Sequence, residues 1–188
     1  MSEEHEATQG WQGIWSVDRE HSRAEFSARY LVSKTTGIFG EVAGTLSFDE
    51  ENPQNSSVEA TIEVPSLDTG RIERDEDLLE REDFFQAESF PEITFRSTRV
   101  EESGDDRMRV VGDLTIRDVT KETILDVHYK DHNVDGLGTH RATFEAETEL
   151  SREGFGIDWG GAPGRAVIGD TVSVKLYLEA VREGILNI

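Results

Sequence analysis

The sequence predicts an all-β protein, a closed antiparallel barrel of about eight strands with one or two short helices between the middle strands. Apolar and polar residues alternate with a period of two along most of the chain. This alternation is typical of strands that have one buried and one solvated face. Turn-forming residues separate the alternating runs. A sheet of many such strands must curl or close, because open edges invite aggregation, so a barrel or a sandwich follows.

Eight strands are predicted from the alternating runs, and a short extra strand at Trp15 and Val17 precedes them. Charged or hydroxyl-bearing residues fill most positions between the apolar ones, which favours antiparallel pairing over a parallel sheet buried on both faces. Turns rich in Asn, Asp and Gly fall at residues 52–55, 103–106 and 135–138. The apolar positions of the eight runs lie within residues 26–30, 42–48, 58–64, 93–100, 108–116, 125–129, 142–150 and 172–180.

Residues 67–90 break this alternation and predict one or two short helices. Ser66 or Asp68 is placed to cap the start of the segment, and Pro91 ends it. Helices between two strands of a barrel would lie across one of its ends as a lid. The apolar residues at helical spacing are Ile72, Leu78, Leu79, Phe84 and Phe85.

The length of 188 residues fits one domain, and the chain contains no internal repeat of the kind that builds solenoids. We predict a disordered acidic leader over residues 1–12 and a single barrel domain over residues 13–188. The leader lacks the basic and apolar regions of a secretory signal. No segment approaches the roughly 20 apolar residues that span a bilayer. A cytoplasmic protein without stable membrane insertion is therefore expected.

The formal net charge is −21, from 40 acidic and 19 basic residues. A field of this sign repels nucleic-acid phosphates and anionic membrane surfaces, so neither is expected as a general partner. Few of the basic residues are lysines, and we interpret the charge as adaptation to high salt rather than as ordinary acidity. The chain has no cysteine, which excludes disulfides, zinc–thiolate sites and cysteine nucleophiles.

Removal of salt is expected to weaken the fold, because the repulsion among the surface carboxylates is then no longer screened. Circular dichroism and thermal melting in dilute buffer and in molar salt test this expectation. Equal thermal stability in the two solutions would contradict the interpretation as salt adaptation.

His21 is the first candidate for catalysis, because it follows a short strand in a turn that also contains Asp18. One interpretation is a general base that acts with Asp18 or Asp75 in a hydrolase, and the other is a hydrogen-bonded turn histidine. Arg71 and Arg74 beside Asp75 form either an acid–base or ion-binding cluster or a set of solvated ion pairs. No serine lies in a nucleophile-elbow motif, so no catalytic residue is assigned.

The other histidines do not predict a metal site. By alternation His128 points to the charged side of a strand, His132 sits in a turn, and His140 opens the next strand. Their side chains are therefore not expected to converge. The glycines within residues 160–164 indicate a flexible turn rather than a phosphate-binding loop.

Aromatic residues offer a better indication of function than the titratable ones. A barrel of about eight strands is just wide enough either to pack solid or to hold one small ligand, and the sequence leaves both outcomes open. The residues expected to line the interior are Phe26, Phe48, Phe95, Leu114, Ile116 and Phe144.

A series of short motifs resembles the YceI-like family, in order from about Trp15 to Val181. Each motif is short, and together they are specific. The motifs are Trp15-Ser-Val-Asp18 with His21-Ser22, Gly37-Ile-Phe39-Gly40 with Gly44, Ser66-Leu-Asp68-Thr-Gly70 with Arg74-Asp75 and Leu78, Asp83-Phe84-Phe85, Phe90-Pro91-Glu-Ile-Thr-Phe95, Gly112-Asp-Leu114-Thr115-Ile116-Arg117 with Val119-Thr120, Arg152-Glu-Gly-Phe155-Gly156 and Val167-Ile-Gly169-Asp170.

The resemblance implies a lipocalin-like barrel that holds the apolar tail of a polyisoprenoid, such as a quinone or a prenyl phosphate. It implies binding, storage or transport of this lipid without catalysis and without a cofactor. The residues then expected at the lid or mouth are Phe84, Phe85 and Phe155, with Arg71, Arg74 and His21 placed to contact a polar head group.

The sequence departs from the family pattern at three positions. Tyr30 and Asp77 stand where histidines are often found, and Asp118 stands where glycine is usual. A mechanism that requires those histidines is not expected here, whereas a binding role that depends on apolar lining survives. Two alternatives stay open: a hydrolase that acts through His21, and a solid-packed barrel that acts through its surface, for instance as a homodimer.

Overall fold

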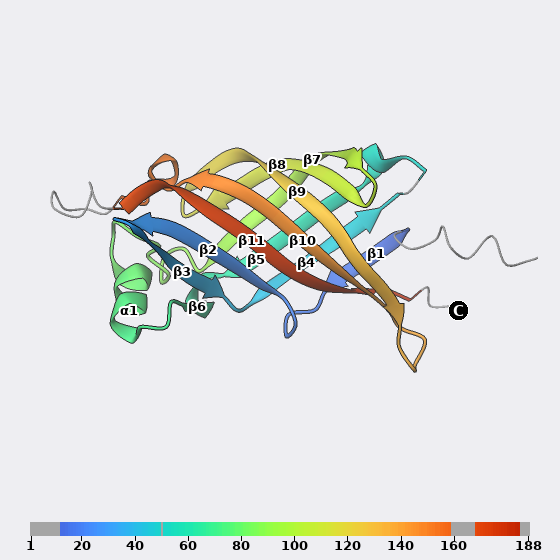
Figure 1. The fold of residues 1–188 in the computed structure, drawn as a ribbon, viewed down its shortest axis with the longest axis horizontal. Helices are drawn as coiled ribbons and strands as arrows, with labels where there is room; N and C mark the ends of the chain where they lie inside the picture. Colours follow the sequence, from blue (N-terminus) through green and yellow to red (C-terminus); the bar gives the residue numbers. More distant parts are fainter. Residues whose placement is uncertain (1–11, 50, 159–167, 185–188) are drawn as a thin grey trace, which may run out of the picture.

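The computed structural model describes residues 12–49, 51–158 and 168–184. Within them a single sheet closes on itself as an antiparallel barrel (Figure 1), which confirms the predicted fold class. In ring order the eight strands are β1 (Gly13–Val17), β4 (Val42–Phe48), β5 (Ser57–Glu63), β7 (Glu92–Gly104), β8 (Arg107–Ile116), β9 (Val119–Val134), β10 (His140–Ser151) and β11 (Ile168–Arg182). The ring closes because β1 pairs with β4 on one side and with β11 on the other.

Three further strands, β2 (Arg23–Tyr30), β3 (Ser33–Phe39) and β6 (Leu67–Asp68), extend the sheet beside β11. The 15-residue β11 pairs with β1 near its C-terminal end and with β2 nearer its start. The ring has the predicted eight strands, but their assignment was wrong at one place, because β1 belongs to the ring and β2 lies outside it. Alternation did not predict β3, whose first residues, Ser-Lys-Thr-Thr-Gly, are polar or small.

One α-helix, α1 (Ile72–Glu80), lies at the end of the barrel near the turn between β2 and β3 (Figure 1). This helix confirms the predicted helical segment, but the predicted apolar stripe is wrong at both ends. Ile72 is 77% exposed, and Phe84 and Phe85 follow the helix in a series of turns. The helix has only nine residues, so just its C-terminal part reaches the core. The turns then bring Phe84 back onto the barrel, where it is buried.

The start of α1 is organised by Asp75 and not by the predicted caps Ser66 or Asp68. The Asp75 carboxylate accepts hydrogen bonds from the backbone N–H of Thr69, at 2.9 Å, and from its hydroxyl. Arg71, at the N-cap, makes no side-chain cap. Three short 3-10 helices complete the described structure: η1 (Pro53–Asn55), η2 (Val64–Ser66) and η3 (Glu153–Phe155).

Two sequence predictions fall on parts of the chain that the structure does not describe. The predicted acidic leader over residues 1–12 lies outside the described residues except for Gln12, and so do the glycines within residues 160–164. Among the described residues no helix is long and apolar enough to cross a bilayer.

Aromatic side chains close the end of the barrel opposite α1. Phe48 and Phe144 stack with their ring centroids 5.8 Å apart, and Trp15 and Tyr129 each meet Phe144 edge to face. Trp15 and Phe144 are both 0% exposed. We call these four residues the aromatic floor. Since β1 holds Trp15 between β4 and β11, the strand that closes the ring also supplies part of the floor.

Candidate ligand-binding cavity

A cavity of about 490 Å³ lies inside the barrel, and its walls are predominantly apolar. Its blind end is the aromatic floor, from which Phe48 and Phe144 reach the cavity wall. Its mouth lies at the α1 end, where the wall residues Arg29, Tyr30 and Arg71 are exposed. The volume falls within the roughly 300–1,000 Å³ of small-molecule sites. The barrel is therefore hollow rather than packed solid.

The sequence prediction located most of the wall correctly in space, because period-two alternation decides which side chains face inward. It did not single out the wall formed by β11, where Val172, Val174 and Leu176 are only half-buried beside the open volume. His21 does not reach the cavity wall. The predicted residues that do reach it are Phe26, Phe48, Phe95, Leu114, Ile116 and Phe144, together with Phe84, Phe85, Phe155, Arg71 and Arg74.

Arginines concentrate the positive charge of the cavity at its mouth. Arg74 donates from Nε to the Thr69 hydroxyl at 2.8 Å and from a terminal nitrogen to the Thr69 carbonyl at 2.7 Å. Arg29 and Arg71 reach the wall close by. The predicted cluster of Arg71, Arg74 and Asp75 does not form as ion pairs among the described residues, because Thr69 takes up both Arg74 and Asp75. Among the described residues, no carboxylate therefore pairs with Arg71 or Arg74.

Arg152 contributes to the wall in a different way. Its guanidinium is buried and donates to three backbone carbonyls, those of Ile157, Ile168 and Gly169, at 3.0–3.1 Å. These bonds tie the chain after β10 to the start of β11. Arg152 therefore shapes the cavity near its mouth, with its donors already occupied by backbone. The sequence motif contained this residue but gave no indication of this role.

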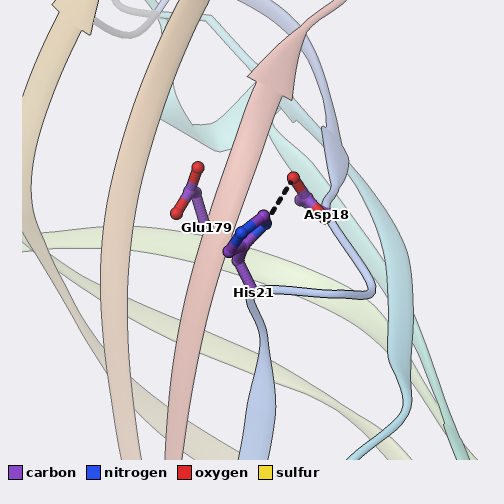
Figure 2. Close-up of side chains that lie close together, drawn as sticks. All are labelled: Asp18, His21 and Glu179. Carbon is purple, nitrogen blue, oxygen red and sulfur yellow. Dashed lines mark hydrogen bonds and ion pairs between the residues drawn. The ribbon is translucent and has the colours of Figure 1, made fainter.

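His21 lies on the outside of the barrel, in the turn between β1 and β2. Figure 2 shows it between Asp18 of the same turn and Glu179 of β11, with its Nδ1 3.0 Å from Asp18 Oδ2. Arg141 of β10 reaches the same two carboxylates, at 3.3 Å from Asp18 and 2.9 Å from Glu179. The group thus joins the β1–β2 turn to β10 and β11.

The electrostatics of this group fit a set of structural ion pairs between the β1–β2 turn and the neighbouring strands better than a catalytic or metal site. The hydrogen bond to Asp18, and then the charge of that carboxylate, raises the pKa of His21. Burial raises the pKa of Asp18, but its hydrogen bonds from His21, Glu20 and Arg141 outweigh burial and lower it. Asp18, His21 and Glu179 are close enough to share a metal ion, yet Arg141 already forms ion pairs with both carboxylates.

A hydrolase at His21 that forms an acyl-enzyme needs a side-chain nucleophile, and the neighbouring serine does not supply one. Ser22 is 4% exposed. Its hydroxyl donates to the Glu179 carbonyl at 3.3 Å and accepts from the Glu179 amide at 3.0 Å. The Ser22 hydroxyl is therefore committed to the backbone of Glu179 and does not act as a nucleophile for His21.

His140 opens β10 as predicted, but the predictions that His132 lies in a turn and that the two side chains do not converge were wrong. His132 lies in β9, which continues to Val134, and its Nε2 is 2.9 Å from Nδ1 of His140 on the neighbouring strand. The rings stack, and His132 also packs edge to face with Trp15. Their spacing in sequence does not show this pairing, because β9 is longer than its apolar alternation indicates. Among the described residues no third ligand joins them in a metal group.

Acidification is expected to destabilise the protein through His132. Burial, and then the charges of His140 and Arg182, lowers the pKa of His132 below its ordinary 6.5. The unfolded chain therefore binds a proton first as the pH falls through about 6.5, and stability is lost from there down to the lower pKa of the folded state. Unfolding free energies of the parent chain and of His132→Asn between pH 7.5 and 5.5 measure this contribution.

His21→Asn is the control for that measurement, because the sign for His21 is opposite. Its raised pKa contributes stability below about 6.5 that is lost as the pH rises through the folded-state value. Its side chain is 58% exposed, so solvent screens this contribution. A pH dependence that is unchanged in His132→Asn would contradict the assignment to His132.

Comparison with known proteins finds this architecture in one family. Residues 15–180 match the YceI-like domain. The chain belongs to the YceI-like family. Protein YceI of an Escherichia coli strain is 35% identical to this YceI-like chain over 164 residues, which cover 86% of the chain and 85% of that protein.

Solved structures show the same barrel. The crystal structure of Burkholderia cenocepacia BcnA aligns with a TM-score of 0.77 and 24% identity, and the match covers 87% of this YceI-like chain and 98% of BcnA. A Saccharophagus degradans protein, described as a polyisoprenoid binding domain implicated in plant cell wall breakdown, aligns with a TM-score of 0.68 and 17% identity. That match covers 90% of this chain and 98% of the other. At these identities the two comparisons establish the fold.

Proposed function

We propose that this YceI-like chain binds, stores or carries a long-chain isoprenoid lipid, with the apolar tail in the barrel and the polar head at the mouth. The observation that carries the proposal is the cavity, which combines apolar walls and an aromatic floor with a mouth bearing arginines. The described neighbour from Saccharophagus degradans has a similar barrel and is a polyisoprenoid binding domain, which supports an isoprenoid as the apolar ligand.

Apolar burial alone supplies affinity for such a ligand. Each buried CH₂-sized group contributes about 0.8 kcal/mol, and a preformed cavity requires little reorganisation of the protein. Branched isoprenoid tails suit walls made of branched and aromatic side chains, such as Ile116, Leu114 and Phe95. The tail therefore needs no polar partner inside the barrel.

The mouth favours an anionic head group of the prenyl-phosphate type over a neutral quinone. Arg29, Arg71 and Arg74 reach the wall there, and hydrogen bonds from guanidinium to phosphate are roughly twice as strong as bonds between neutral groups. His21, which lies outside the cavity, takes no part in this contact. The proposal assigns no catalytic residue and requires no cofactor.

Organic extraction of the purified protein in its native salt, followed by mass spectrometry, tests the proposal. We expect an isoprenoid in a stoichiometric amount, and its mass identifies the head group. If the protein is purified empty, incubation with prenyl phosphates and with quinones before gel filtration is expected to load it. The ratio of the two lipids bound in competition measures the preference for an anionic head.

A folded protein that stays empty after both incubations would overturn the proposal. In that case hydrolase activity is the next function to measure, with His21→Ala as the diagnostic variant. A catalyst would lose turnover in that variant while its fold is kept. A lipid binder would keep its ligand, because His21 lies outside the cavity.

A further inference from the structure

The turn between β2 and β3 carries three consecutive apolar side chains into solvent at the α1 end of the barrel (Figure 1). Tyr30 is 44%, Leu31 61% and Val32 97% exposed. We call residues 30–32 the apolar tip. These side chains add little to the free energy of unfolding, because apolar surface that stays in water gives no hydrophobic stabilisation.

Two further features near the tip cost stability. The backbone of Leu31 has a φ of 53°, in the left-handed region that favours glycine or asparagine over leucine. Next to the tip, Arg29 lies directly opposite Lys34 across the two strands, and like charges in opposed positions are destabilising. Neither cation forms an ion pair with a described carboxylate, although the chain has 40 acidic residues. Local features that lower the stability of a fold, such as a strained backbone, are found frequently at functional sites.

The apolar tip is part of the rim of the cavity. Arg29 and Tyr30 line the mouth itself. Ile72, at the start of α1, is 77% exposed, and the adjacent Arg71 also lines the mouth. Figure 1 shows α1 at the same end of the barrel as the turn between β2 and β3. Exposed apolar side chains and cations thus lie at the opening through which a lipid would enter or leave, beside the acidic residues of α1.

We infer that the apolar tip docks reversibly on a membrane surface that contains anionic lipids, with the cavity mouth facing the bilayer. The inference rests on the proposed function, because docking there brings the mouth to the source or destination of the lipid. Leu31 and Val32 enter the interfacial region, and Arg29 and Lys34 contact lipid phosphates. This contact is peripheral and requires no spanning segment.

The size and the charge of the apolar tip favour a lipid surface over a protein as its binding partner. Three residues of one turn expose far less surface than the roughly 800 Å² per partner of a stable protein interface, whereas a bilayer needs no complementary shape. The net charge of −21 repels the body of the protein from an anionic surface. Arg29 and Lys34 make the turn itself cationic, whereas the neighbouring helix α1 is acidic. Attraction to lipid phosphates is therefore confined to this turn, and it favours approach with the tip first.

Flotation with vesicles tests the inference, in the salt concentration at which circular dichroism shows complete folding. The vesicles contain phosphatidylglycerol and phosphatidylcholine in equal amounts, or phosphatidylcholine alone. The tip variant combines Leu31→Asn with Val32→Ser, and asparagine suits the left-handed backbone. Leu137→Ser is the matched control, because Leu137 is 94% exposed in the turn between β9 and β10.

We expect the parent chain and Leu137→Ser to float with the anionic vesicles. The tip variant should partition to them more weakly by about tenfold or more, with a melting temperature no lower than that of the parent. Arg29→Gln with Lys34→Gln should weaken binding to anionic vesicles and leave the weaker binding to phosphatidylcholine unchanged. Equal flotation of the parent and the tip variant, or no flotation of the parent, would overturn the inference.

Two parallel measurements separate this inference from the proposed function. Loading with lipid from detergent solution needs no membrane, and the tip residues Leu31 and Val32 do not line the cavity. Normal loading in the tip variant with lost flotation supports docking, whereas failed loading of the parent contradicts the proposed function instead. If the parent ignores vesicles but forms a dimer that the tip variant dissociates, the tip is a self-association surface and the inference is wrong.

Discussion

Replacement of Trp15 by alanine is expected to lower the free energy of unfolding by about 3–5 kcal/mol, the range for a buried large aromatic side chain. Trp15 is 0% exposed and meets the rings of His132 and Phe144 edge to face at 6.0 and 6.5 Å. The void left by the indole cannot collapse easily, because β1 is held between β4 and β11 in a closed sheet. Its position on β1 adds to the effect, since β1 is the strand that closes the ring.

Urea or guanidinium unfolding of Trp15→Ala, followed by far-ultraviolet circular dichroism, measures this loss. Ile14→Ala is the matched control, because Ile14 precedes Trp15 in the same strand and is 47% exposed. Its cost should stay close to that of ordinary surface substitutions, about 0.5 kcal/mol. A loss below about 1 kcal/mol in Trp15→Ala would mean that the aromatic floor contributes little to closing the barrel.

The sequence predicted the wall of the cavity better than the order of the strands. Phe26, Phe95 and Leu114 could be assigned to the interior because a strand points alternate side chains to opposite faces, which is a local property. Which strand closes the ring is a non-local property. β1 closes it because β11 is long enough to pair with two strands in succession. The alternation of Trp15 and Val17 does not indicate that β11 is the partner of β1.

The errors at the lid and among the histidines have a similar origin. Ile72 and Phe84 fit one helical stripe in sequence, but the helix ends at Glu80, and hydrogen bonds from the following turns back to α1 place Phe84. His132 was expected in a turn because polar residues surround it. Pairing with β10 extends β9 beyond its apolar residues, and it brings His132 against His140. Tertiary pairing overrode the local pattern in both cases.

The apolar tip was also beyond the reach of sequence reasoning. Tyr30, Leu31 and Val32 continue an apolar strand in the sequence, and nothing there marks a tight turn, which usually contains glycine or asparagine. The pairing of Tyr30 with Ser33 forces the chain to reverse at this point. Tyr30, which the alternation places on the apolar face, and the two apolar residues after it therefore lie exposed to solvent beside the mouth.

Ala146→Phe is expected to reduce lipid binding by about tenfold or more, because a phenyl ring at this position fills the cavity. Ala146 lies on β10 between Leu176 of β11 and Val127 of β9, and all three residues line the cavity. It is 2% exposed, so the added ring can extend only inward. Some overpacking, of about 1–3 kcal/mol, should accompany the change, which a melting curve measures on the same sample.

Ala43→Phe separates loss of the cavity from a general effect of adding a ring. Ala43 follows the buried Val42 in β4 and is absent from the cavity wall, so its ring points outward and binding should remain at the level of the parent. Titration of both variants with a fluorescent isoprenoid in detergent measures the affinity directly. Stoichiometric binding by a folded Ala146→Phe variant would place the lipid on the outside of the barrel. Loss in that variant alone would locate the tail inside, because the two substitutions add the same group to opposite faces of one sheet.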